Sequence, residues 1–296
     1  MMESYSPVLY RFQRKESNMA LLFIDFDRTL YDHDEKTIHK PDVEALIQAK
    51  NNGHKLFLST GRPHIHLDGI LPENLFEGGL FSCGAKVSIQ EKTIYLHAFE
   101  PADIKMLISS LLERKIDFTV DGDTRRFLTP FAMEIFNRRC RSNELEDCEF
   151  NLFAKQRRTS YPIETLSEED YQSVLKISIY AQDYDICKEF ISQLPDRFRA
   201  FIHRNKKDHF IGGEIALKSI NKSIGLQKIL EYYGNPNLET IAIGDSKNDV
   251  EILKIAKLGI CMGNGCDEAK EVADFITKPI QECGIAYALR FLHILD

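Results

Sequence analysis

The sequence lacks the long apolar runs and the excess of basic residues that mark membrane proteins and nucleic-acid-binding proteins. No apolar stretch approaches the roughly 20 residues that a helix needs to cross a bilayer. Acidic residues outnumber basic ones, 45 against 38, which gives a formal net charge of −7 at pH 7. Broad nucleic-acid binding needs a basic face. We therefore expect neither a membrane nor a nucleic-acid partner, although a local basic pocket could still receive a small anion.

The cysteines lack the pattern of a disulfide framework or a zinc site. There are seven, an odd number, and no two of them form a CxxC pair. Reduced thiols in a cytoplasmic protein are the simplest interpretation. Residues 1–19 lack the apolar segment of a secretory signal, and we expect them to form a polar N-terminal extension.

Apolar runs near the start of the chain indicate a parallel sheet. Residues 21–26, LLFIDF, form the continuous apolar run of a strand that is buried on both faces. Helical spacing follows over residues 40–53, with Pro41 in the first turn and Gly53 at the end. Residues 54–62 then form a second apolar strand. Strand, helix and strand in succession predict a βαβ unit.

The same alternation returns in the last third of the chain. We expect helices over residues 222–234, 248–259 and 284–295, and strands over 240–246, 259–264 and 274–278. The predicted fold class is therefore α/β, with a doubly wound, Rossmann-like parallel sheet. Its core would combine residues 20–87 with residues 211–296.

Residues 88–210 follow another pattern and predict an inserted α+β domain. We expect helices over 102–115 and 185–194, and alternating strands with one solvent-facing side over 116–122, 174–182, 197–204 and 209–215. Residues 131–170 are polar and are expected to be rich in loops.

Polar side chains follow three of the predicted core strands. They are Asp25, Asp27 and Thr29 after the first, Ser59, Thr60, Gly61 and Arg62 after the second, and Gly244, Asp245, Asn248 and Asp249 after a later one. Ligands of open parallel sheets bind beyond the carboxyl ends of the strands, so these carboxylates should crowd one edge. Two like charges 4 Å apart repel by about 4 kcal/mol at an effective dielectric of 20. Protonation or a cation must relieve this repulsion, and oxygen ligands favour Mg²⁺.

Each polar set has an ordinary structural explanation when it is taken alone. Aspartates at strand ends often serve in turns, and Asn248 or Asp249 could cap the following helix. Lys222 could be a solvated residue at the start of a helix, and His64 and His66 are expected to be surface or loop residues. Three polar sets in order, each after an apolar strand, favour a functional site over these explanations.

Together these motifs resemble the haloacid dehalogenase superfamily, and in particular the Cof-type phosphatases, which carry a large α+β cap after the third core strand. The matches, in order, are Asp25-Phe26-Asp27-Arg28-Thr29 with DxDxT, Thr60-Gly61-Arg62 with the second motif, Lys222 with the third, and residues 244–249, GDSKND, with the fourth. The sequence departs from the family at Arg28, where Gly is usual, and at Cys83, in a loop that often reads NGA.

The resemblance implies a role for each matched residue. Asp25 would be the nucleophile that forms an aspartyl-phosphate, and Asp27 would be the general acid and then the general base. Mg²⁺ would be held by Asp25, the Asp27 backbone carbonyl and Asp245. Phosphate would be bound by the hydroxyl and amide of Thr60, by Gly61, by Asn248 and by Lys222, which would also be catalytic. Thr29 and Asp249 would hold these groups in place without contacting the phosphate or the Mg²⁺ themselves.

The expected function is that of a two-domain, Mg²⁺-dependent phosphatase of a small phosphorylated metabolite, with the insert acting as a lid. A sugar phosphate is the leading substrate by family analogy. Two alternatives stay open. A sugar phosphomutase would share these motifs, and a non-catalytic ligand-binding or regulatory protein could use the same scaffold. The latter should tolerate the loss of Asp27, whereas this sequence retains every catalytic group. The sequence does not indicate an oligomeric state.

Overall fold

The chain folds into two compact units. The computed structural model describes residues 19–67, 71–72, 74–141, 159–205 and 210–295. Apart from Met19, the predicted N-terminal extension lies outside these residues. The core unit comprises residues up to 61, residues 71–95 and residues from 221 onward, and the inserted unit comprises residues 62–70 and 96–220.

This division differs from the predicted insert, residues 88–210, at both edges. Residues 88–95 belong to the core unit because β6 (Lys86–Ile89) and β7 (Lys92–Leu96) extend its sheet. Residues up to 220 belong to the inserted unit because β13 (Phe210–Leu217) pairs with strands of that unit.

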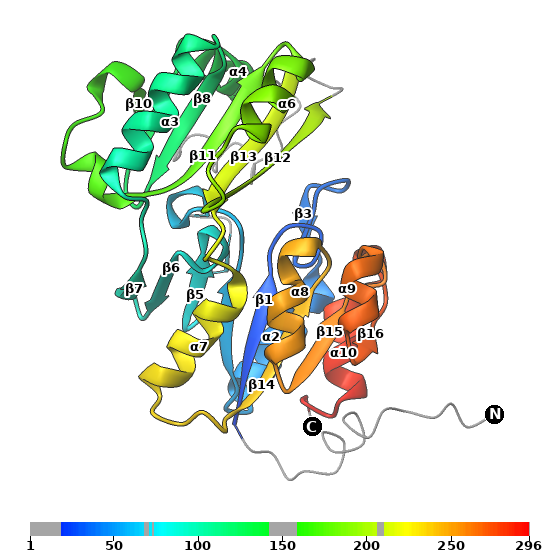
Figure 1. Cartoon of the computed structure of the whole chain (residues 1–296). Coiled ribbons are helices and arrows are strands. Elements are labelled where there is room, and N and C mark those ends of the chain that lie inside the picture. The colour runs from blue at the N-terminus through cyan, green and yellow to red at the C-terminus, as the bar shows by residue number, and fades with distance from the viewer. Residues whose placement is uncertain (1–18, 68–70, 73, 142–158, 206–209, 296) are drawn as a thin grey trace. The chain divides into compact units, whose positions relative to one another are not determined.

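An eight-stranded sheet forms the centre of the core unit (Figure 1). Its order is β16 (Phe275–Ile276), β15 (Leu258–Cys261), β14 (Glu239–Gly244), β1 (Ala20–Asp25), β4 (Lys55–Ser59), β5 (Gly78–Phe81), β6 and β7. The strands from β16 to β5 are parallel, and β6 returns antiparallel to β5. The predicted parallel sheet of an α/β fold is confirmed.

Helices cover both faces of this sheet. Leu21 and Phe23 of β1 pack in one cluster with Leu226 of α7 (Lys222–Tyr232) and with side chains of α8 (Val250–Ile255) and α9 (Asp267–Val272). Alternate residues of a strand point to opposite faces, and Leu22 is as fully buried as its neighbours. The remaining pair, α2 (Lys40–Asn51) and α10 (Gly284–Phe291), pack against each other. Burial on both faces explains why β1 reads as a continuous apolar run.

A short hairpin follows β1. Its strands are β2 (Tyr31–Asp32) and β3 (Thr37–Ile38), which pair antiparallel with each other. This hairpin was not predicted, because two-residue strands leave no periodic signal in the sequence.

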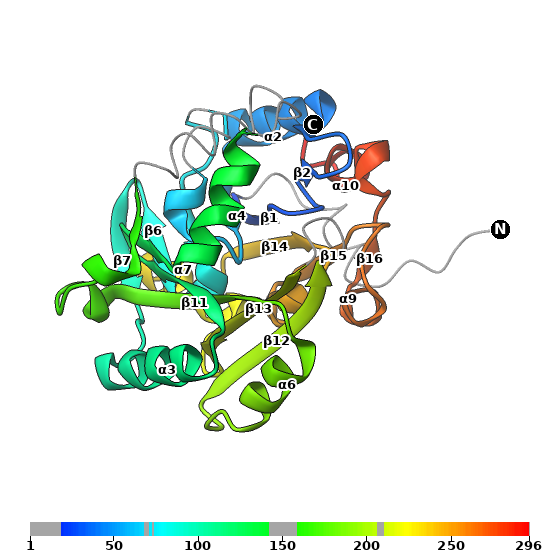
Figure 2. The ribbon, with the colours of Figure 1, turned by 90° about the horizontal axis from the view of Figure 1, so that it is seen from above.

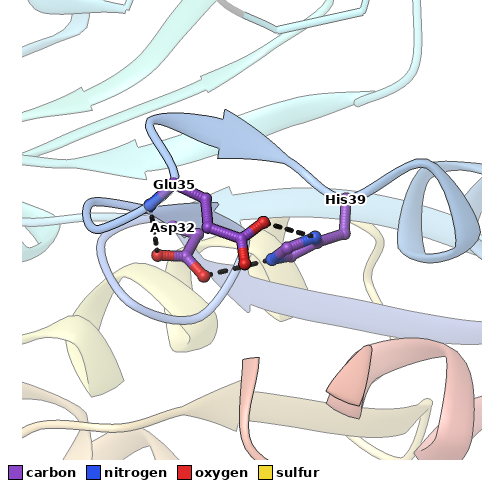
Figure 3. A group of neighbouring side chains, drawn as sticks. All are labelled: Asp32, Glu35 and His39. Atoms are coloured by element: carbon purple, nitrogen blue, oxygen red, sulfur yellow. Dashed lines mark hydrogen bonds and ion pairs between the residues drawn. The ribbon is translucent and has the colours of Figure 1, made fainter. Parts of the chain in front are cut away.

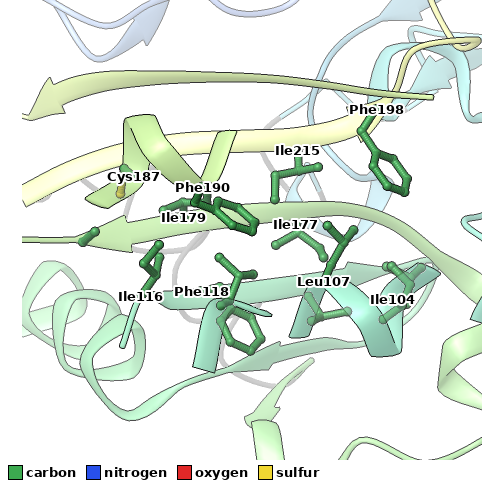
Figure 4. Close-up of a cluster of buried hydrophobic side chains, with 14 of the residues drawn as sticks. Ile104, Leu107, Ile116, Phe118, Ile177, Ile179, Cys187, Phe190, Phe198 and Ile215 are labelled. Carbon is green, nitrogen blue, oxygen red and sulfur yellow. The ribbon is translucent and has the colours of Figure 1, made fainter. Parts of the chain in front are cut away.

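The inserted unit contains a six-stranded sheet with one apolar face. The order is β10 (Ser160–Pro162), β9 (Arg126–Leu128), β8 (Asp117–Gly122), β11 (Val174–Ala181), β13 and β12 (Phe198–Asn205). Phe118, Ile177 and Ile215 pack with α3 (Pro101–Glu113) and α6 (Tyr184–Ser192) in the cluster of Figure 4. Figure 2 shows α3 and α6 on one side of β11, β13 and β12, and α4 (Pro130–Arg141) on the other.

The helix α4 corrects the expectation that residues 131–170 are rich in loops. Ala132 and Phe136, one helical turn apart, pack on Leu128 of β9. This contact helps to stabilise the helix, and tertiary packing of that kind overrides a weak local signal. Residues 142–158 lie outside the described part of the chain. Among the described residues, we find no helix with the length and apolar character needed to span a membrane.

Candidate active site

The polar sets that follow the core strands meet at one edge of the sheet. Asp25 is the last residue of β1 and lies opposite Ser59 of β4, so Thr60 and Gly61 follow at the same edge. On the other side of β1, Ile24 lies opposite Ile243 of β14, which places Gly244 and Asp245 next to Asp25. The parallel register therefore brings together residues from both ends of the chain.

A buried lysine joins two of these carboxylates. Lys222 is the first residue of α7, and its Nζ lies 2.5 Å from Oδ1 of Asp25 and 2.5 Å from Oδ1 of Asp249. The side chain of Lys222 is 0% exposed, and those of Asp25 and Asp249 are 6% and 1% exposed. Lys222 is therefore not a solvated residue at the start of a helix. Burying a charge this deeply is favourable only when opposite charges surround it.

Asp245 completes the set of buried carboxylates. One oxygen of each of Asp25, Asp245 and Asp249 lies within 4.8 Å of the others. The hydroxyl of Thr29 donates to Oδ1 of Asp245 over 3.2 Å. Oδ2 of Asp249 accepts from the amides of Asp245, at 3.2 Å, and Ser246, at 3.0 Å. Thr29 and Asp249 thus hold the Asp245 carboxyl and the backbone of residues 245 and 246 in place; the supporting roles in catalysis predicted for them stay predictions.

Gly244 makes room for this arrangement. A Cβ on Gly244 would lie 2.4 Å from Cγ of Asp249, a distance that real side chains do not reach. Glycine at this position therefore lets the Asp249 carboxylate turn back to the Asp245 amide and to Lys222.

The electrostatics of the site leave negative charge uncompensated. Burial, followed by the charges of Asp249, Asp245 and Asp27, raises the pKa of Asp25 well above its usual value, and Lys222 only partly opposes this. Burial and Asp249 raise the pKa of Asp245 to about 6. Burial alone would lower the pKa of Lys222, but Asp249 and Asp25 raise it, so the lysine stays charged. A set of oxygen donors with excess negative charge fits a hard divalent cation such as Mg²⁺.

Asp27 stands apart from the buried carboxylates. Its side chain is 36% exposed, and Oδ1 lies 2.7 Å from Nε2 of His33 in the β2–β3 hairpin. This histidine could not be predicted from sequence patterns, because its contact with Asp27 depends on a tight turn between residues 26 and 31. Phe26 O accepts from the Leu30 and Tyr31 amides in that turn.

The residues predicted to bind phosphate are partly confirmed as neighbours. A Cβ on Gly61 would lie 3.5 Å from Nδ2 of Asn248 and 3.3 Å from Sγ of Cys83, so these groups surround Gly61. Thr60 is fully buried at the same edge. Its amide, however, donates to Leu80 O over 2.8 Å. The predicted use of the Thr60 amide for phosphate is therefore wrong, and the side chain is left as the contact to test.

Both departures from the family pattern lie at backbone positions that suit glycine or asparagine. Arg28 has φ 63° and Cys83 has φ 58°, in the left-handed region. The positive φ explains why glycine is usual at position 28. The guanidinium of Arg28 also helps to lower the pKa of Asp245, although burial of that carboxyl has the larger and opposite effect.

The inserted unit holds a second polar group that the sequence did not indicate. Asp121, Arg126 and Lys176 are cross-strand neighbours on the face opposite the apolar core. Oδ1 of Asp121 lies 3.0 Å from Nε of Arg126 and 3.8 Å from Nε2 of His66. Burial, reinforced by nearby Arg126, Lys176 and Arg62, lowers the pKa of His66 well below its usual value.

This face corrects two expectations. His66 was expected to be a surface or loop residue, and the strands of the insert were expected to have one solvent-facing side. Instead, Thr119 and Asp121 are fully buried, and the side chain of His66 is mostly buried. Among the residues that the structure describes, Thr119 Oγ1 and His66 Nε2 find no hydrogen-bond partner. The alternation of apolar and polar residues along these strands predicted which side chains share a face. It could not predict that the polar face is buried.

Comparison with known proteins now assigns the fold and site to a family. Residues 22–289 match the haloacid dehalogenase-like hydrolase family. The chain belongs to this family. The membership confirms the predicted relationship, including its Cof-type character, and it makes the protein a hydrolase; the phosphatase names of its relatives support a phosphatase.

The curated relatives match over nearly their whole length. The 5-amino-6-(5-phospho-D-ribitylamino)uracil phosphatase YitU of Bacillus subtilis is 28% identical over 279 residues, which cover 93% of this chain and 98% of that protein. The putative phosphatase YkrA of the same organism is 25% identical over 279 residues, with the same coverage.

Solved structures agree with this haloacid dehalogenase-like fold. A sugar phosphatase of subclass IIB superposes with a TM-score of 0.71 at 24% identity, covering 94% of this chain and 100% of that one. A putative Cof-like hydrolase from Plasmodium vivax superposes with a TM-score of 0.74 at 20% identity, covering 97% of this chain and 100% of that one. At these identities the likeness concerns the fold alone.

Proposed function

We propose that this haloacid dehalogenase-like hydrolase is a Mg²⁺-dependent phosphatase that acts through an aspartyl-phosphate on Asp25. The observation that carries the proposal is the buried contact of Lys222 with Asp25 and Asp249, beside Asp245 at the carboxyl edge of the sheet. A fully buried lysine between two carboxylates is costly to desolvate. A folding role alone would not require it, whereas phosphoryl transfer uses fixed charges of this kind.

The first step transfers the phosphoryl group to the enzyme. A carboxylate oxygen of Asp25 attacks phosphorus, and the bond between phosphorus and the leaving oxygen breaks. Asp27 gives its proton to that oxygen, so the product leaves as an alcohol. Lys222 holds Asp25 in the attacking position through Oδ1 and offsets negative charge on the transferred group. Thr60, Gly61 and Asn248 orient the phosphoryl oxygens.

The second step regenerates the enzyme. Asp27, now ionised, takes a proton from water, and the water oxygen attacks the phosphorus of the aspartyl-phosphate. The bond between phosphorus and the Asp25 oxygen breaks, which releases inorganic phosphate and restores the carboxylate. Mg²⁺ held by Asp25, Asp245 and the Asp27 carbonyl would supply positive charge that offsets these carboxylates and the phosphoryl oxygens.

The names of similar proteins support a small, hydroxyl-rich substrate. The relative YitU is a phosphatase of a phosphorylated ribitylamino compound, and a solved structure with the same fold is a sugar phosphatase. The substrate class that we propose is therefore a sugar or polyol phosphate.

The test measures phosphate release from a panel of phosphorylated metabolites and from p-nitrophenyl phosphate. We expect turnover that stops when EDTA removes divalent cations and returns with Mg²⁺. Sugar and polyol phosphates should be the best substrates. Asp25→Asn should abolish turnover, because the amide is a poor nucleophile, while circular dichroism shows an unchanged fold.

Different results would separate the rival functions. Activity that is indifferent to chelation, or that survives Asp25→Asn, would contradict the proposed mechanism. Dependence on a bisphosphate activator with phosphate transferred to a second position of a sugar would indicate a phosphomutase. Absence of turnover for every substrate despite tight binding of one of them would favour a non-catalytic protein.

A further inference from the structure

A histidine contacts the carboxylate to which we assign acid–base chemistry. Nε2 of His33 lies 2.7 Å from Oδ1 of Asp27, within the range of hydrogen bonds to a charged group. The two side chains are 43% and 36% exposed, so the pair borders on solvent. An exposed aspartate would normally sample several rotamers, and a directed hydrogen bond selects one of them.

Stacked rings hold the imidazole in place. The edge of Tyr31 meets the ring of His33 at a centroid distance of 5.0 Å and an angle of 84°. Tyr31 in turn stacks on Phe26 at 5.3 Å, and Phe26 is fully buried. The amide of Arg28 donates to Tyr31 O over 2.9 Å, which closes the turn between Asp27 and the hairpin. The position of His33 is therefore fixed from the core outward.

The other end of the hairpin is braced by Asp32. Its Oδ1 accepts from the amides of Asp34, at 2.9 Å, and Glu35, at 3.2 Å, and its Oδ2 lies 3.1 Å from Nε2 of His39 (Figure 3). Asp32, Glu35 and His39 are close enough together to suggest a metal site. Both Asp32 oxygens are already engaged, however, so we assign this group to bracing the turn that carries His33.

We infer that His33 is a positioning residue for Asp27, holding the carboxyl group in the orientation needed for proton transfer. The inference rests on the proposed role of Asp27 as general acid and base. An imidazole suits the task because it can donate from one tautomer and accept in the other. It donates to Asp27 when the carboxylate is ionised and accepts from Asp27 when the carboxyl is protonated. The contact therefore persists through both steps, while Asp27 loses its proton to the leaving group and regains one from water. The imidazole proton exchanges between the two ring nitrogens through the solvent that borders the pair.

The signature of such a role is a dependence on the leaving group. Nitrophenolate is a stable anion that departs without receiving a proton, whereas phenolate depends more on the general acid. Phenyl phosphate and p-nitrophenyl phosphate have nearly the same shape, so they report on proton transfer rather than on recognition. The relevant constant is kcat/KM, because it covers the steps up to departure of the leaving group.

The experiment compares kcat/KM for these two substrates in wild-type protein, His33→Ala, His33→Gln and Asp27→Asn. We expect His33→Ala to lower the value for phenyl phosphate about tenfold and that for p-nitrophenyl phosphate less than twofold, because a misplaced acid loses part of its contribution. His33→Gln, whose amide can also donate and accept, should restore the ratio of the two values to within about twofold of wild type. Asp34→Ala, a neighbouring exposed control, should leave the ratio unchanged.

The outcomes separate this inference from the function on which it rests. The inference would be overturned if His33→Ala lowered kcat/KM equally for both substrates, or for neither, and Asp27→Asn still changed the ratio of the two values. If Asp27→Asn itself left the ratio unchanged, Asp27 would not be the general acid, and both assignments would fall together. Thermal unfolding of each variant shows whether the hairpin and the fold are retained.

Discussion

At the scale of single residues, the groups of the site meet only when distant strands and a helix come together. Lys222 was identified only through the resemblance to the family's third motif, whereas Asp25, Asp245 and Asp249 could be identified because each ends or follows a strand with a strong apolar pattern. The engagement of the Thr60 amide could not, because its acceptor, Leu80 O, becomes a neighbour only when β5 joins the sheet. The contact between Asp27 and His33 likewise depends on a turn that leaves no periodic signal.

The raised pKa of Asp245 predicts how the Mg²⁺ requirement changes with pH. Protons compete with Mg²⁺ for this carboxyl below its pKa of about 6. We expect the Mg²⁺ concentration for half-maximal turnover to rise by at least about tenfold per pH unit below pH 6, because the pKa of Asp25, the other carboxylate ligand, is also raised and its protonation adds to the competition. Assays of p-nitrophenyl phosphate across Mg²⁺ concentrations at pH 5, 6, 7 and 8 measure this directly.

Arg28→Gly provides the matched variant for that measurement. Removing the guanidinium removes a charge that lowers the pKa of Asp245. As the pH falls, the Mg²⁺ concentration for half-maximal turnover should therefore begin to rise at a higher pH than in wild type. A Mg²⁺ requirement that is the same at every pH would show that Asp245 does not take part in holding the cation.

At the scale of elements, a buried carboxylate links α2 to α10. Asp42, in the first turn of α2, is fully buried, and its Oδ1 accepts from the Ala286 amide near the start of α10 over 2.7 Å. A carboxylate at a helix N-terminus is favourable, but Oδ2 is buried and has no hydrogen-bond partner within the described part of the chain. Burial dominates and raises the pKa of Asp42 to about 6, against the partial opposition of Ala286, His39 and Arg290.

Asp42 should make stability fall as the pH rises. Because the pKa of its carboxyl in the folded protein exceeds the usual 3.8, folding favours the protonated form. This contribution is fully present below pH 3.8 and is lost as the pH rises through about 6. At about 1.4 kcal/mol per pH unit, the loss amounts to about 3 kcal/mol. Asp42→Asn keeps the acceptor and removes the charge.

Urea unfolding of wild type and Asp42→Asn between pH 4 and pH 8 measures this contribution. The free energy of unfolding of wild type should fall relative to that of the variant over the range from about pH 4 to pH 7. Parallel pH profiles for the two proteins would mean that Asp42 ionises in the folded protein as it does in the unfolded chain.

Elements with strong periodic patterns were predicted well, and elements stabilised by tertiary contacts were not. The parallel strands other than β5, together with α2, α7 and α10, could be identified because burial on fixed faces imposes a pattern on the sequence. The helix α4 depends on a few contacts with β9, and the β6–β7 hairpin depends on pairing with β5. Neither contact is visible before the fold is known.

At the scale of the whole molecule, the site depends on convergence of distant parts of the chain. Lys222 and Asp25 are 197 residues apart, yet their side chains are in contact. The chain leaves the core unit after residues 61 and 95 and returns at residues 71 and 221. At the second return, Asn221 caps α7 and Lys222 begins it. An insertion of this size can diverge in sequence without displacing the catalytic groups. This explains why the core motifs could be predicted from the sequence and the polar face of the insert could not.

The central claim is that Asp25 carries the phosphoryl group during turnover, and trapping that group tests it most directly. Asp27→Asn should slow hydrolysis of the intermediate while p-nitrophenyl phosphate, which needs no acid, still transfers its phosphoryl group. Acid quenching of this variant during turnover, followed by borohydride reduction and peptide mass spectrometry, locates the acyl phosphate. We predict modification of Asp25 alone; modification of a different residue, or none during active turnover, would contradict the account.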